Sequence, residues 1–95
     1  MDENLDLTKI VKQILIIKKS IEKNLPAITT EIEVIINRGI KSTQRIERIL
    51  DTLLDYGQME VGEKEFRQLN DYYASFNQEN AAFYNAFYEE MNGEE

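Results

Sequence analysis

The acid–base chemistry open to this chain rests on its 18 carboxylate side chains, and half of these lie in residues 58–95. The candidates are Glu60, Glu63, Glu65, Glu89 and Glu90. A carboxylate that acts as a general acid or base needs an apolar setting or a charged partner that shifts its pKa. No pair among these five has apolar neighbours that would provide such a setting. We therefore interpret them as solvated side chains on helix faces.

Histidine and cysteine are both absent from the 95 residues. The absence removes the commonest general base and any thiolate ligand for a metal ion. Ser20, Ser42 and Ser75 consequently have no histidine to activate them as nucleophiles. The Glu-x-x-His motif of di-iron helical bundles cannot occur either. The sequence predicts a protein that is not an enzyme and that holds neither a metal ion nor a cofactor.

Basic side chains recur every three or four residues after Gly39, so they would share one face of a helix. Residues 39–50 resemble the turn and second helix of a helix-turn-helix motif. The side chains that would contact nucleic acid in that case are Lys41, Gln44, Arg45 and Arg48. The other interpretation is that the basic residues flank a helix seam and pair with carboxylates. We favour the second interpretation and keep a small DNA-binding regulator as an alternative function.

The net charge of −7 is distributed unevenly along the chain. Residues 1–26 carry a net charge of +1, residues 27–57 carry −1, and residues 58–95 carry −7. The acidic last third would repel phosphate backbones and attract a basic partner. A second alternative function is therefore an acidic inhibitor or mimic that binds a basic protein surface through residues 60–95.

The length predicts a single domain, residues 1–95. No run of 18 apolar residues is present, which argues against a membrane span. The segment Met1–Asn4 is acidic, whereas an export signal begins with basic residues. We expect a cytoplasmic protein with no membrane among its partners.

Hydrophobic periodicity predicts three helices, at about 6–24, 27–55 and 63–91. Pro26 is expected to end the first helix, because proline disfavours helical geometry in the residue before it. Short connections favour antiparallel neighbours, so we predict an all-α antiparallel three-helix bundle with coiled-coil-like seams. The alternative is a break of the second helix near Gly39, which would give four helices.

Each predicted helix carries an apolar stripe that we expect to form part of the core. The first stripe consists of Leu7, Ile10, Ile14, Ile17 and Ile21. The stripe of the last helix consists of Phe66, Leu69, Tyr73, Phe76, Asn80, Phe83 and Phe87. Aliphatic residues dominate the first two helices and aromatic residues the third, which predicts complementary packing.

The three predicted helices differ in length, so part of the second and third should extend beyond the first. The predicted overhang carries Ile49, Leu50, Leu53, Leu54, Tyr56, Phe66, Leu69, Tyr72 and Tyr73. Such an apolar surface needs a cover, which would be a second copy or another protein. The alternative cover is residues 1–6 of the same chain. The leading expectation is thus a non-enzymatic protein–protein interaction module that forms a homo-oligomer or binds a partner.

Overall fold

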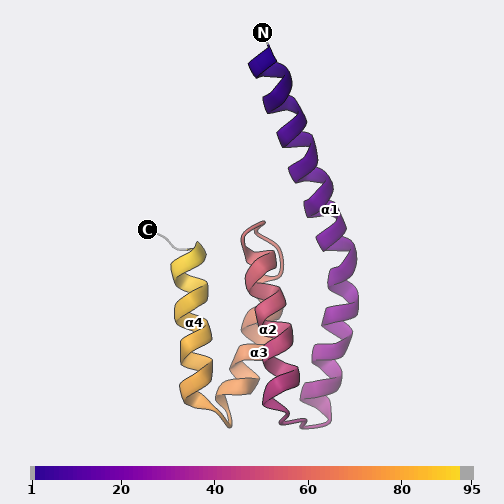
Figure 1. Ribbon diagram of the computed structural model, residues 1–95. Coiled ribbons are helices and arrows are strands. Elements are labelled where there is room, and N and C mark those ends of the chain that lie inside the picture. Colours follow the sequence, from indigo (N-terminus) through magenta and orange to yellow (C-terminus); the bar gives the residue numbers. More distant parts are fainter. Residues whose placement is uncertain (1, 93–95) are drawn as a thin grey trace.

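The computed structural model describes the backbone of residues 2–92 and the side chains of residues 7–91. Within these residues, the regular structure consists of four helices and no strand, which confirms the all-α prediction. Successive helices run in alternating directions (Figure 1). The helices are α1 (Asp2–Asn37), α2 (Thr43–Gly57), α3 (Glu63–Ala74) and α4 (Gln78–Asn92). The boundaries differ from those of the predicted three-helix bundle at three places.

The first difference is that α1 continues through Pro26 for 36 residues. The predicted boundary between 6–24 and 27–55 is therefore wrong. Proline removes only one hydrogen bond from the helix, the one that residue 26 would donate to the carbonyl of Glu22. The helix on the C-terminal side of Pro26 is held by burial, because Ile32 and Ile35 are fully buried. This packing overrides the local preference of the proline.

The second difference is the break after Asn37, which confirms the alternative of an interruption near Gly39. Gly39 has φ +63°, a left-handed conformation that glycine adopts without steric cost. The amide of Ile40 donates to the carbonyl of Ile35 at 2.9 Å, and the amide of Gly39 donates to Ile36 at 3.2 Å. Together these two bonds form a Schellman motif that ends α1.

The new helix α2 begins after Ser42, whose hydroxyl accepts a hydrogen bond from the amide of Arg45 at 3.2 Å. This is the interaction expected of an N-cap serine. The connection from α2 to α3 falls between the predicted helices 27–55 and 63–91, because α2 ends at Gly57 and α3 begins at Glu63. Gly62 adopts φ +89° there, and an added Cβ would lie 3.0 Å from Cδ2 of Leu53.

The third difference is that the predicted helix 63–91 is interrupted at residues 75–77. The hydroxyl of Ser75 donates to the carbonyl of Tyr72 at 2.6 Å. The side chain of Asn77 accepts from the amide of Asn80 at 3.2 Å and so caps α4. Serine and asparagine compete with the helix through such local bonds. As a result α4 folds back beside α3 instead of extending it (Figure 1).

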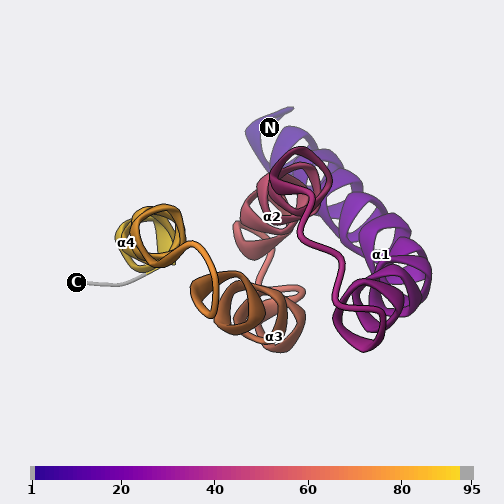
Figure 2. The same cartoon turned by 90° about the horizontal axis from the view of Figure 1, so that it is seen from below.

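The core is formed by α2 and α3 together with the C-terminal half of α1 and one side of α4. In both views α2 and α3 lie between α1 on one side and α4 on the other (Figures 1 and 2). The buried cluster comprises Ile32, Ile35, Ile46, Ile49, Leu50, Leu53, Phe66, Leu69, Tyr73, Ala81 and Tyr88. The aliphatic and aromatic residues therefore pack together, as the sequence predicted.

The N-terminal part of α1 projects beyond the bundle (Figure 1). The level at which α1 leaves the bundle is marked by Leu25, whose Cδ1 would lie 3.7 Å from a Cβ added to Gly62. We call residues 2–24 the arm. The prediction that its apolar stripe packs in the core is wrong, because Leu7, Ile10, Ile14 and Ile17 are exposed and Ile21 is only partly buried. The alternative in which residues 1–6 cover the bundle concerns side chains outside the described residues.

Candidate functional site

The nine residues of the predicted overhang lie inside the bundle. Leu50, Leu53, Phe66, Leu69 and Tyr73 are fully buried, and Ile49 is 6% exposed. Leu54, Tyr56 and Tyr72 are partly buried against this cluster. The expectation that these side chains form an exposed surface is therefore wrong. The reason is that α4 turns back at residues 75–77 and α1 continues past Pro26, and both changes cover α2 and α3.

The large exposed apolar surface lies instead on the arm. Its exposed side chains, between 44% and 66% accessible, are Leu7, Ile10, Val11, Ile14, Leu15, Ile16 and Ile17. Helical periodicity places six of the seven in one wide sector and Ile16 on the opposite side. The lysines of the arm are Lys9, Lys12, Lys18, Lys19 and Lys23. From residue 7 onward the arm is thus a basic amphipathic helix, and its apolar side chains at 7–17 are exposed.

A second exposed apolar surface lies on α4. Phe83 and Phe87 are 62% and 50% exposed, and their rings stack with centroids 6.2 Å apart. The prediction that both belong to the core is wrong, because the break before α4 turns this part of the stripe outward. The two rings border a groove of about 450 Å³ between α2 and α4. Its other lining residues are Glu47, Asp51, Leu54, Asn80 and Tyr84.

Polar contacts hold α4 against α2 beside this groove. The hydroxyl of Tyr84 donates to Asp51 at 2.8 Å, and Asn80 donates to Glu47 at 3.1 Å. Tyr73 also donates to Glu47, at 2.5 Å. Burial, and then the hydrogen bond to a carboxylate, raises the pKa of Tyr84 and that of Tyr73. Both phenols therefore stay protonated and act as hydrogen-bond donors at neutral pH.

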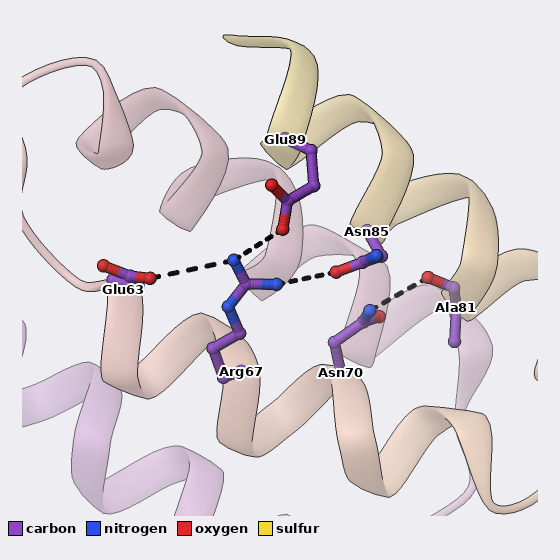
Figure 3. A network of polar contacts seen from close by, with 6 residues as sticks. All are labelled: Glu63, Arg67, Asn70, Ala81, Asn85 and Glu89. Carbon is purple, nitrogen blue, oxygen red and sulfur yellow. Dashed lines mark hydrogen bonds and ion pairs between the residues drawn. The ribbon is translucent and has the colours of Figure 1, made fainter. Parts of the chain in front are cut away.

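A second polar network joins α3 to α4 around Arg67 (Figure 3). Its guanidinium donates to Asn85 at 2.6 Å and to Glu89 at 2.9 Å, and it lies 3.7 Å from Glu63. The same group lies 5.1 Å from the ring centroid of Tyr88. These contacts border a polar cleft of about 810 Å³. Because the side chain of Arg67 is engaged by both helices, we assign it a structural role.

The residues of the helix-turn-helix alternative do not form one exposed basic surface. Arg45 pairs with Glu31 of α1 at 3.2 Å, and the ammonium of Lys41 lies 5.5 Å from the ring centroid of Phe76. Gln44 and Arg48 are exposed on α2. The break at Gly39 and the helix after it do occur. DNA binding itself stays a prediction.

The carboxylates considered for catalysis are spread over three segments. Glu63 and Glu89 flank Arg67, whereas Glu60 lies in the connection between α2 and α3 and Glu90 is exposed on α4. Glu65 is partly buried on α3. Among the described residues, no three carboxylates converge to hold a metal ion. The expectation that the protein is not an enzyme stays a prediction.

Sequence reasoning found the residues of the arm but assigned them to the core. The sequence periodicity itself indicates one continuous first helix. The apolar sector of residues 7–21 continues through Leu25 into the sector of Ile28, Ile32 and Ile35, which packs in the core. A continuous helix of 36 residues is about 54 Å long, which no helix of 15 residues can cover. Continuity through Pro26 would therefore have predicted an uncovered end.

The fold and its surfaces define a small all-α protein, a helical bundle with a projecting basic amphipathic arm. No helix in the described part of the chain is both long enough and apolar enough to cross a membrane. The sequence matches no known family model and no curated protein, and the fold matches no solved structure.

Proposed function

We propose that this chain is a protein–protein interaction module that self-associates through its arm. The observation that supports this is the exposure of seven large apolar side chains on one projecting helix segment. Exposed apolar patches of this kind mark interaction surfaces in soluble proteins. This proposal keeps the function expected from the sequence and places the surface on α1 instead of α2 and α3.

The magnitude of the hydrophobic term supports an assembly in which both partners contribute an arm. The six side chains of the apolar sector, which are about half exposed, would contribute roughly 4 to 9 kcal/mol if they were all buried. Association costs an estimated 4 to 15 kcal/mol in lost freedom. Two arms in a reciprocal contact contribute about twice as much as one arm, roughly 8 to 18 kcal/mol, against the same cost of association. A second copy is therefore a more suitable partner than a small peptide.

The test is the molar mass in solution, measured by light scattering over a range of concentrations. We expect a multiple of the chain mass of 11.2 kDa for the unmodified protein. Ile14→Asp together with Ile17→Asp should yield monomers, because both charges fall in the apolar sector. The matched control is Gln13→Asp together with Ser20→Asp, which adds the same charge to exposed positions on the polar side of the arm. This control should associate normally.

Two results would overturn the proposal. One is a monomer at every concentration for the unmodified protein, including the case in which that monomer binds vesicles of anionic lipid through its basic amphipathic arm. The other is unchanged association of the Ile14→Asp and Ile17→Asp variant. Because the arm lies outside the core, α2, α3 and α4 should remain folded in all variants, and circular dichroism checks this.

The two alternatives raised by the sequence stay predictions. A DNA-binding regulator would need salt-sensitive binding to duplex DNA that is lost when Arg45 and Arg48 are changed to alanine. An acidic mimic would need a complex with a basic protein that weakens as salt is added.

A further inference from the structure

The groove between α2 and α4 carries apolar and acidic side chains that could receive the arm, and α4 lies on the opposite side of the bundle from α1 (Figure 1). Two stacked phenylalanine rings, Phe83 and Phe87, border the groove and are at least half exposed. Leu54 adds an aliphatic side chain to the same groove. Aromatic rings at an exposed groove are typical of binding surfaces, because burying them contributes a large hydrophobic term.

The carboxylates of the groove are held in fixed positions. Asp51 accepts a hydrogen bond from Tyr84, and Glu47 accepts from Tyr73 and Asn80. All of these contacts join α2 to α3 or α4, so the groove does not need to be rebuilt when a partner binds. A preformed groove lowers the entropic cost of binding.

The charges of the arm and of the groove are complementary. The arm from residue 7 onward carries five lysines and one acidic residue, Glu22. The helix α4 carries Glu79, Glu89 and Glu90 and no lysine or arginine, and α2 adds Glu47 and Asp51 to the groove. Opposite charges around an apolar contact favour the correct partner and fix its register. Pairing two arms with each other would leave both phenylalanines exposed.

The geometry favours a contact between two copies over a contact within one chain. In both views α1 and α4 lie on opposite sides of the pair formed by α2 and α3, and the arm points away from the bundle (Figures 1 and 2). Residues 7–24 of the arm span about 27 Å, which is close to the length of about 22 Å for the 15 residues of α4. The arm could therefore lie along the whole groove of another copy.

We propose that the arm of one copy lies in the groove between α2 and α4 of a second copy, with its apolar sector on Phe83 and Phe87 and with Lys18, the one lysine that helical periodicity places in that sector, beside Glu47 and Asp51. This inference rests on the proposed function, because it names the surface that receives the arm. The contact joins two different surfaces, so it closes only when it is reciprocal, as in a two-fold dimer in which the arms are exchanged.

The first test changes the groove and leaves the arm intact. Phe83→Ala together with Phe87→Ala should raise the dimer dissociation constant at least about 100-fold, because each dimer loses four half-exposed rings from its contacts. Gln68→Ala together with Asp71→Ala, on the exposed face of α3, is the matched control and should leave the constant unchanged. If the groove variant associates as the unmodified protein does while the variant with Ile14→Asp and Ile17→Asp is monomeric, the proposed function stands and this inference fails.

The second test uses the absence of cysteine from the chain. A chain with Phe87→Cys is mixed under mild oxidation with chains that carry Ile10→Cys, Ile14→Cys or Ile17→Cys. We expect a mixed disulfide between the two kinds of chain with at least one arm position, and none when Gln68→Cys replaces Phe87→Cys. Disulfides formed only between two arms, or no mixed disulfide at any position, would overturn the inference.

Discussion

Changing Pro26 to alanine tests the feature of the fold that the sequence predicted least well, the continuity of α1. Pro26 is exposed, so the substitution removes no buried contact. Alanine supplies the missing amide hydrogen, which can donate to the carbonyl of Glu22, and it removes the clash of the proline ring with the preceding turn. We therefore expect the helix to gain stability at the point where the arm leaves the bundle.

The size of this stabilisation follows from the hydrogen bond and the helical geometry that the proline prevents. Alanine is favoured over proline in a helix interior by about 3 kcal/mol, of which the restored hydrogen bond accounts for about 0.5 to 1.5 kcal/mol. Ile32 and Ile35 are fully buried, whereas the arm is exposed, so the gain should stabilise the arm against local opening more than the bundle against unfolding. A gain of about 2 to 3 kcal/mol lowers the equilibrium constant for opening of the arm about 30- to 150-fold.

Amide hydrogen exchange measures this directly, at a concentration where the chain is monomeric. In the unmodified protein the amides of residues 27–29 should be protected, since they bond to carbonyls on the far side of Pro26. In Pro26→Ala, amides of the arm should exchange roughly 30- to 150-fold more slowly, because the arm opens less often by that factor. Ser20→Ala is the control, because it changes only helix propensity in the arm. Unprotected amides at 27–29, or arm exchange that is the same with and without the proline, would refute a continuous α1.

Three further predictions concern the bundle. Leu50→Ala should lower the free energy of unfolding by about 2 to 5 kcal/mol in urea titrations, because the side chain is fully buried. Gly62→Ala should lower the melting temperature more than Gly39→Ala does, since both glycines have positive φ but only the first would place a Cβ 3.0 Å from Leu53. Burial and a neighbouring carboxylate raise the pKa of Tyr84, so the folded state holds this proton more tightly than the unfolded state. The contribution of Tyr84 to stability is therefore constant below pH 10 and falls as the pH rises further, and Tyr84→Phe should make that fall shallower. An equally steep fall in the variant would contradict this assignment.

The parts of the fold that could be predicted are those in which local chemistry and burial agree. Gly62 lies in a connection that the sequence predicts, and the structure requires its left-handed conformation there. Ile46, Ile49 and Leu53 follow the spacing of one helix face, and they do lie on one helix, α2, although the prediction left Ile49 and Leu53 uncovered. Gly39 was ambiguous, because a glycine inside a helical pattern can be tolerated or can end the helix. The Schellman bonds that decide the matter depend on where the next helix packs.

The helix boundaries that could not be predicted are those at which the local preference of a residue and burial in the core favour different structures. Pro26 favours the end of a helix, yet the buried residues after it keep the helix intact at the loss of one hydrogen bond. Ser75 and Asn77 lie in a strongly helical pattern without a glycine or proline to mark a break. Their side chains form local bonds that the pattern does not reveal, and the break lets Phe66 stack on Tyr88 with ring centroids 4.4 Å apart.

These two boundary errors also explain why the apolar surplus was assigned to the wrong helices. A chain of 95 residues cannot bury every apolar stripe that this sequence carries, and sequence reasoning placed the excess at the ends of the second and third predicted helices. Folding α4 back covers Phe66 and Tyr73 but turns Phe83 and Phe87 outward. Continuing α1 past Pro26 carries its stripe beyond the bundle. The surplus thus divides into an aliphatic arm and an acidic aromatic groove, and in the dimer that we propose each of these surfaces covers the other.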